Sequence, residues 1–217
     1  MGWLISSLRQ VVETLAGDRP WALRLGGGVI TLVLVVGSGG LGWGIEHLAM
    51  ASRGPIQAIA WLALLIALAS ALAGKSLEQG VQAVLDQRDD LPEARLKLSW
   101  IVGRDTANLD RSAILRALAE TASENGVDGL FAPLFWMLVG AGLWAINPAW
   151  IGPLSLAWAF KAASTLDSML GYRRGKLAWL GTAGARLDDL LVWLPCRLVA
   201  LSLPLASGQS LGKALAM

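Results

Sequence analysis

The sequence is poor in the residues that build metal sites and covalent catalysts. Its 217 residues include a single cysteine, Cys196, and a single histidine, His47. One cysteine excludes a disulfide within the chain and a zinc site built on cysteines. No Ser-His-Asp or Cys-His arrangement is indicated, so nucleophilic hydrolysis is not expected. We predict that Cys196 is a small packed side chain and that His47 packs near a membrane interface, with a catalytic role as the alternative.

Charge is scarce as well. Charged residues make up 16% of the chain and hydrophobic residues 55%, whereas soluble domains carry about 25% charged residues. The net charge of +2, without a basic stripe and interleaved aromatics, argues against a nucleic-acid partner. Residues 1–10 lack the features of a signal peptide, and we find no β alternation and no internal repeat. The composition therefore predicts a membrane protein.

Long apolar stretches dominate what remains. A membrane-spanning helix takes about 20 apolar residues. We predict an all-α, polytopic membrane protein of one domain, residues 1–217, with four to five membrane helices and amphipathic cytoplasmic helices. The candidate membrane helices are residues 26–51, 56–73, 130–147, 153–170 and 187–206. The glycines between Gly26 and Gly44 suit close packing between helices, because no Gly-Lys-Ser/Thr sequence follows to complete a phosphate loop.

The longest polar segment is residues 74–128. Its apolar spacing predicts helices at 75–87 and 93–102, and a third helix that Asp110 or Ser112 caps. Because this segment contains many charged side chains, we expect it to lie outside the membrane.

A second polar segment, residues 171–189, is rich in arginine and lysine. Two predicted crossings, 130–147 and 153–170, separate it from residues 74–128, so both polar segments are expected on the same side. Positive loops favour the cytoplasmic side, so we predict that both segments lie in the cytoplasm. The expected location is the bacterial inner (plasma) membrane. Residues 1–24 are predicted to form an amphipathic surface or interfacial helix.

Three carboxylates stand at positions i, i+4 and i+8 just before a membrane stretch. Glu120, Glu124 and Asp128 would lie near one face of a helix, where like charges repel. A cation would offset that repulsion, and such hard oxygen ligands suit Mg²⁺; a solvated acidic face is the alternative. Asn125 stands beside them and could orient a polar group of a substrate.

The sequence Gly103-Arg104-Asp105-Thr106 offers a guanidinium, a carboxylate and a hydroxyl in one turn. Arginine binds phosphate or carboxylate through two parallel hydrogen bonds. A structural Arg-Asp clip is the alternative interpretation.

A polar island, residues 161–172, lies inside an apolar stretch. Ionisable groups at membrane depth usually face a protein interior or a wet cavity and mark a functional site. Lys161 would meet a phosphate or carboxylate, or extend to the interface. The candidate residues of the island are Lys161, Thr165, Asp167, Ser168 and Tyr172.

Arg186, Asp188 and Asp189 are expected to begin the last helix. Acidic side chains suit a helix N-terminus, and this capping role competes with a role in substrate binding.

Several motifs occur together, in order, over residues 75 to 200. They are Leu-Lys-Leu-Ser-Trp-Ile-Val-Gly-Arg-Asp-Thr from Leu96, Glu-Thr-Ala-Ser-Glu-Asn-Gly-Val-Asp-Gly from Glu120, Ala-Pro-Leu-Phe-Trp from Ala132, Lys161 through Tyr172, and Ala-Arg-Leu-Asp-Asp from Ala185 with Leu194-Pro195. In these motifs the chain resembles the CobD/CbiB family of membrane-bound adenosylcobinamide-phosphate synthases.

The resemblance implies a ligase that joins adenosylcobyric acid to aminopropanol, or to its O-phosphate, by an amide bond. It implies Mg²⁺ and ATP as cofactors and a corrinoid as substrate. Expected partners are the lipid bilayer and other corrinoid-assembly membrane enzymes. The alternative is a non-catalytic membrane scaffold or sensor related to the family. A transporter is a third hypothesis, but it would predict inverted repeats with broken helices, which we do not find.

The resemblance also suggests roles for the candidate residues. Glu120, Glu124 and Asp128 would hold Mg²⁺ or the amine. The expected phosphate ligands are Arg104, Lys161 and Arg186. The expected orienting residues are Asn125, Thr165 and Asp167. Family members are usually longer at both ends, so the expected alternatives are a fragment, a mis-assigned start or a shortened paralogue. Gly126 stands where threonine is common, and Ser164 where asparagine is common.

Overall fold

The computed structural model describes residues 1–206, which are helical and contain no β-strand. Contacts divide the chain into two compact units. Unit 1 comprises Met1–Ala71 and the chain from Ala132 onward, and unit 2 comprises Leu72–Phe131. Because the placement of one unit against the other is not determined, each is described by itself. The prediction of a single domain over 1–217 stays a prediction.

Three helical stretches among the described residues are long and apolar enough to cross a membrane: Pro20–Ala51, Pro55–Leu85 and Arg111–Ile146. This confirms an all-α membrane protein. The predicted spans 153–170 and 187–206 also fall on helices, but both carry charged side chains and are not among these three stretches.

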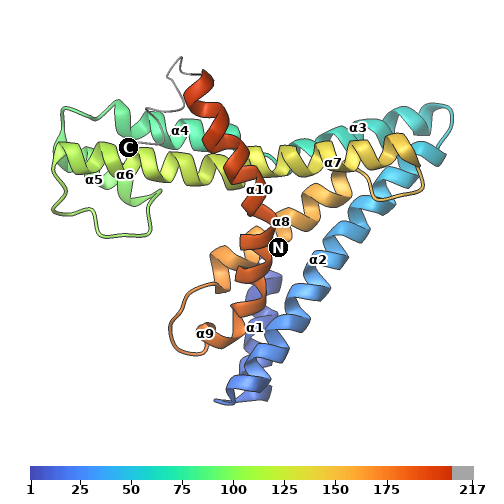
Figure 1. Ribbon diagram of the computed structural model, residues 1–217, viewed down its shortest axis with the longest axis horizontal. Coiled ribbons are helices and arrows are strands. Elements are labelled where there is room, and N and C mark those ends of the chain that lie inside the picture. The colour runs from blue at the N-terminus through green and yellow to red at the C-terminus, as the bar shows by residue number, and fades with distance from the viewer. Residues whose placement is uncertain (207–217) are drawn as a thin grey trace. The chain divides into compact units, whose positions relative to one another are not determined.

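Unit 1 is built around a pair of long helices. Its helices are α1 (Gly2–Ala16), α2 (Pro20–Ala51), α3 (Pro55–Ser70), α7 (Ala132–Ile146), α8 (Pro153–Leu170), α9 (Leu177–Leu180) and α10 (Thr182–Ala206). In Figure 1, α8 runs beside α2, and α1 and α9 lie against the N-terminal half of α2. Helices α7 and α10 also pack on α8.

Proline starts three of these helices. Pro20, Pro55 and Pro153 take the first position of α2, α3 and α8. The missing N–H costs nothing there, because N–H groups of the first turn have no partner within the helix. As a result α2 begins before the predicted stretch 26–51 and runs unbroken through its glycines for 32 residues.

The glycines of α2 allow its neighbours to approach closely. A Cβ atom at Gly42 would lie 2.8 Å from the backbone of Ser155 in α8, and one at Gly27 would lie 1.9 Å from the carbonyl oxygen of Leu180 in α9. Any side chain at these positions would push the helices apart. The predicted small-residue packing is confirmed at both contacts.

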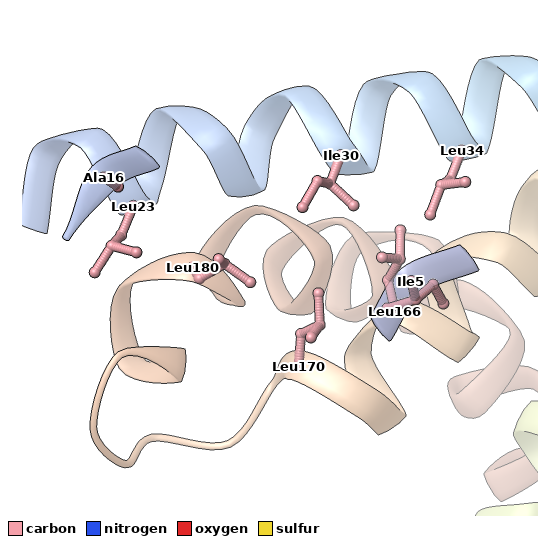
Figure 2. Close-up of a cluster of buried hydrophobic side chains, with 8 residues drawn as sticks. All are labelled: Ile5, Ala16, Leu23, Ile30, Leu34, Leu166, Leu170 and Leu180. Atoms are coloured by element: carbon pink, nitrogen blue, oxygen red, sulfur yellow. The ribbon is translucent and has the colours of Figure 1, made fainter. Parts of the chain in front are cut away.

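A core of leucine, isoleucine and alanine side chains joins α1, α2, α8 and α9. Figure 2 shows this cluster, in which Leu23, Ile30 and Leu34 of α2 face side chains of the other helices. Its buried members are Ile5, Ala16, Leu23, Ile30, Leu34, Leu166, Leu170 and Leu180. Because it includes the last turn of α8, it fixes the end of the polar island 161–172.

Pro195 lies inside α10 without ending it. Proline has no N–H, so the carbonyl of Leu191, four residues earlier, lacks its usual helical partner. The indole N–H of Trp136 in α7 donates to that carbonyl at 3.2 Å. A backbone acceptor inside a membrane needs such a partner, and this hydrogen bond ties α7 to α10.

Unit 2 is a small helical assembly. Its elements are α4 (Gly74–Leu85), α5 (Leu91–Ser99), α6 (Arg111–Gly126) and the π-helical turn η1 (Val127–Phe131). Its core consists of Val84, Ala94, Leu98, Ile114, Ala117 and Leu118. The predicted helices 75–87 and 93–102 correspond to α4 and α5, and the latter ends three residues early, at Ser99.

Of the two predicted capping residues, Asp110 and Ser112, the structure shows that Asp110 caps α6. Its carboxylate accepts the backbone N–H of Ala113 at 2.7 Å and the hydroxyl of Ser112 at 2.9 Å. These bonds lower the pKa of Asp110, the Ala113 N–H contributing most.

Candidate functional site

Three arginines of unit 1 line one cavity of about 360 Å³. Arg24 comes from α2, Arg173 from the turn after α8, and Arg186 from α10. Among the described residues that line this arginine cavity, Asp189 supplies the one carboxylate. The other lining residues are Gly171, Leu177, Ala178, Gly181, Thr182 and Ala185. The lining is therefore strongly positive.

Close backbone contacts build the wall of the arginine cavity. A Cβ atom at Gly181 would lie 1.9 Å from the carbonyl oxygen of Leu170, and one at Gly171 would lie 2.1 Å from a carboxyl oxygen of Asp167. Glycine at position 181 lets the start of α10 approach the end of α8, and glycine at position 171 leaves room for the Asp167 carboxyl. That approach brings Arg173 and Arg186 to the same cavity.

Aromatic rings hold two of the neighbouring arginines. The guanidinium of Arg24 lies over the ring of Trp179, 4.4 Å from its centre, and that of Arg174 lies 5.0 Å from the centre of the Tyr172 ring. Such cation–π contacts contribute about 0.5–1 kcal/mol at exposed sites. Tyr172, a predicted substrate residue, is exposed and packs on Arg174.

The hydroxyls of the polar island bond within their own helix. Thr165 donates to the carbonyl of Lys161 at 2.7 Å, and Ser168 donates to the carbonyl of Ser164 at 2.9 Å. Lys161 and Asp167 are half-buried in α8. The structure thus places Lys161, Thr165, Asp167 and Ser168 along α8 and Tyr172 in the turn after it. The roles of these residues toward a substrate stay predictions.

The predicted capping role of Asp188 and Asp189 is wrong. Helix α10 begins at Thr182 instead of residue 187, and its first turn contains no acidic residue. The short helix α9 ends at Leu180, and α10 follows directly after Gly181. The last helix therefore begins several residues before the two aspartates. Asp188 is buried and Asp189 lines the arginine cavity, and their role in substrate binding stays a prediction.

A buried carboxyl group stands at the other end of α8. Glu46 of α2 is 0% exposed. Its two oxygens accept the backbone N–H groups of Gly152 at 3.2 Å, Leu154 at 2.6 Å and Ser155 at 3.3 Å. These N–H groups begin α8 and have no partner inside it. Glu46 therefore serves as a cap supplied by another helix, and it fixes the position of α8.

In unit 2, the turn at 103–106 is held against the helices. Thr106 is buried and donates to the carbonyl of Arg95 at 3.0 Å. Asp105 accepts the backbone N–H of Ala107 at 2.9 Å, which stabilises the turn. Arg104 pairs with Glu120 of α6. These contacts hold Asp105 and Thr106 within the turn, and the roles of the three residues toward a substrate stay predictions.

The Arg104–Glu120 pair is accessible to solvent. The two side chains are 54% and 52% exposed, and exposed ion pairs contribute about 0–1 kcal/mol. A phosphate could therefore replace the Glu120 carboxylate at Arg104 at little cost.

The three carboxylates of the acidic run do not form a metal cage. Glu120 and Glu124 lie on α6, but η1 begins just before Asp128, so the α-helical register behind the i+8 spacing ends there. In the described part of the chain, no group of three His, Cys, Asp or Glu side chains could hold a metal ion. Asn125 lies beside them and donates to the Thr121 hydroxyl at 3.4 Å.

Three residues at these sites were not predicted as site residues. Arg24 falls in the segment 1–24, which is predicted as an amphipathic helix, and Arg173 falls in the positive segment 171–189. The signal for Glu46 was present: an acidic residue within an apolar helix needs a partner, and Gly152-Pro153 marks a helix start with spare N–H groups.

Comparison with known proteins gives a consistent result. The family model described as CobD/Cbib protein matches residues 1–216. The cobalamin biosynthesis protein CobD of Synechocystis sp. is 43% identical, over 96% of this chain and 59% of that protein. CobD of Klebsiella pneumoniae is 44% identical, over 95% of this chain and 60% of that protein. No solved structure matches the chain.

The relative from Salmonella typhimurium, the cobalamin biosynthesis protein CbiB, is 41% identical over 96% of this chain and 61% of its own length. The chain thus spans about three-fifths of the length of the curated relatives it matches. The family model covers the arginine cavity, the polar island and the acidic run alike. From this match and these identities, the chain belongs to the CobD/CbiB family.

Proposed function

We propose that this chain acts in cobalamin biosynthesis by joining adenosylcobyric acid to aminopropanol, or to aminopropanol O-phosphate. The product would be adenosylcobinamide or its phosphate. The observation that carries the proposal is the family match over residues 1–216, with relatives named as cobalamin biosynthesis proteins.

The chemistry is the formation of an amide bond. The amine nitrogen attacks the carbonyl carbon of a carboxyl group, an oxygen leaves, and the nitrogen loses a proton. A free carboxylate resists this attack, so a nucleoside triphosphate is expected to activate it. Its terminal phosphoryl group would pass to a carboxylate oxygen as the nucleoside diphosphate leaves, and phosphate would leave when the amine attacks. In unit 1, Lys161 and Arg186 would hold phosphate groups, and Thr165 and Asp167 would orient the reactants. In unit 2, Arg104 would hold a phosphate.

Magnesium and ATP remain expectations. Mg²⁺ commonly binds one or two carboxylates together with substrate phosphates rather than an all-protein cage. Since the described residues hold no group of three suitable side chains, we assign no step to a protein-bound ion. Glu124 and Asp128 are the carboxylates we would expect beside a nucleotide-bound ion, because Glu120 pairs with Arg104.

We place the protein in the bacterial inner membrane with residues 74–128 and 171–189 in the cytoplasm. Cations gather at one end of unit 1: Arg24, Arg173 and Arg186 line one cavity, and Lys176 pairs with Asp18 at 3.1 Å. Such clusters favour the cytoplasmic side. Both substrates would then be reached from the cytoplasm.

A bacterial strain that lacks its own CobD/CbiB relative would test the proposal. With adenosylcobyric acid supplied, expression of this chain is expected to restore adenosylcobinamide phosphate in cell extracts, as measured by mass spectrometry. The proposal fails if the protein is folded in the membrane and the extract contains no product.

The same strain tests the assigned residues. Glu124→Gln and Lys161→Ala are expected to abolish product without lowering the amount of protein in the membrane. Glu78→Gln, on the exposed face of α4, is the control and should retain activity. Wild-type product from either Glu124→Gln or Lys161→Ala would remove these residues from the site.

A further inference from the structure

We infer that the arginine cavity is a binding site for a phosphate group, with Arg24, Arg173 and Arg186 as its ligands. This inference deepens the proposed function and rests on it only for the identity of the natural ligand. It adds Arg24 and Arg173 to Arg186, and it concerns binding rather than the reaction.

Charge is the first argument. Three guanidinium groups and one carboxylate line the cavity, and the Asp167 carboxyl lies against Gly171 in its wall. Positive charge is therefore still in excess at neutral pH, where arginine is always protonated. A phosphate monoester carries about two negative charges. Its oxygens accept hydrogen bonds in the paired geometry that guanidinium groups provide.

Construction is the second argument. The three arginines come from α2, the turn after α8 and α10, and they are brought together by close contacts at Gly27 and Gly181. The long helix α10 begins at Thr182, which also lines the cavity. The positive end of its dipole therefore adds to the charge of the arginines.

The surroundings leave two sources for the phosphate. A volume of about 360 Å³ suits a small phosphate ester. An apolar surface of Pro20, Trp21, Leu25 and Trp179 adjoins Arg24, and it would suit the acyl chain of an anionic lipid. Both ligands would place a phosphate among the same three arginines, so the chemistry is shared and the source is open to experiment.

The test uses the full chain, purified in a zwitterionic detergent, without corrinoid or nucleotide. Binding of inorganic phosphate is measured by calorimetric titration. In a second assay the protein is incubated with phosphatidylcholine vesicles that either contain or lack phosphatidylglycerol, and native mass spectrometry measures how much phosphatidylglycerol the protein retains. Variants are Arg173→Gln and Arg186→Gln. Arg174→Gln is the matched control, because Arg174 neighbours Arg173 but packs on Tyr172.

We expect one of two supporting results. If the ligand is soluble, phosphate binds the wild type and the Arg174→Gln control alike, and binds the two cavity variants about tenfold more weakly or worse. If the ligand is a lipid, phosphatidylglycerol is retained by the wild type and the control and is lost from both cavity variants.

Absence of both phosphate and lipid binding in folded wild type would overturn the inference, as would an equal loss in Arg174→Gln. Circular dichroism checks that each variant remains helical, and Arg173 lies in an exposed turn where the substitution is tolerated. Because no reaction is measured, failure here leaves the proposed amide synthesis standing, and failure of the synthesis leaves this binding site standing.

Discussion

At the scale of single residues, Glu46 shows how a buried acid is accommodated in an apolar helix. Its carboxyl oxygens accept three N–H groups at the start of α8, so an acidic group and a helix end satisfy each other. The same helix carries Lys161 and Asp167 toward its other end. A substitution at Glu46 would therefore shift α8 and, with it, the side chains of the polar island.

Replacing Glu46 tests this role. Glu46→Leu should destabilise unit 1 by about 1–3 kcal/mol, because it leaves buried N–H groups without acceptors. Glu46→Gln keeps one oxygen and should cost less. The measurement is unfolding by a denaturing detergent, followed by loss of helical circular dichroism. Equal stability of wild type and Glu46→Leu would show that the cap is dispensable, and Glu78→Leu on exposed α4 controls for the loss of an acid.

At the scale of elements, the hydrogen bond between α7 and α10 compensates for a proline. Trp136→Phe removes the indole donor and leaves the Leu191 carbonyl unpaired, since Pro195 has no N–H to offer. Interhelical hydrogen bonds in membranes contribute about 0.6–2 kcal/mol, and we expect a loss of that size on denaturing-detergent unfolding.

A second substitution makes this prediction specific. Pro195→Ala returns an N–H for the Leu191 carbonyl, so Trp136→Phe should cost less stability in the Pro195→Ala background than alone. Equal costs in both backgrounds would mean that Trp136 acts through packing and not through its hydrogen bond.

Helix α6 is expected to depend on pH through its cap. The N–H of Ala113 holds the pKa of Asp110 below its ordinary value, so the stabilisation is present above the unfolded pKa of about 3.9. It is lost as pH falls through the lower, folded pKa. Hydrogen exchange in the first turn of α6 should therefore speed up in acid in the wild type.

Asp110→Asn serves as the matched variant for that experiment. Asparagine keeps the capping oxygen but does not titrate, so the acid dependence in the first turn of α6 should shrink. An unchanged acid dependence in Asp110→Asn would assign it to another group.

Sequence patterns predicted the elements better than their ends. Apolar runs predicted α2, α3 and α8, because length and hydropathy decide membrane helices. The start of α10 was placed too late, since the break between α9 and α10 depends on the tight contact of Gly181 with Leu170, which no local pattern reports. The π-helical turn η1, which contains Asp128, is likewise not signalled by a local pattern.

The arginine cavity could not be predicted from local sequence patterns either. Arg24 and Arg186 are far apart in the sequence, and only the packing of α2 against α9 and α10 brings them to one cavity. Resemblance to a family supplied Arg186 but not its neighbours. Local motifs thus identified candidate residues, and tertiary packing decided which of them share a site.

At the scale of the whole molecule, the proposed topology has both polar segments, 74–128 and 171–189, in the cytoplasm. In a Cys196→Ser background, single cysteines are introduced by Asp89→Cys, Arg174→Cys and Asn147→Cys. A membrane-impermeant maleimide applied to spheroplasts should label position 147 only, and should label positions 89 and 174 after lysis. Labelling of position 174 from outside would reverse the proposed orientation.

The most direct test of the central claim is the reaction itself. The full chain in detergent is mixed with adenosylcobyric acid, aminopropanol O-phosphate and MgATP, and the products are examined by mass spectrometry. We predict a new species with the mass of the amide, formed only when all three are present. A folded sample that yields no amide, beside an active CbiB relative under the same conditions, would contradict the proposed synthase activity of this chain.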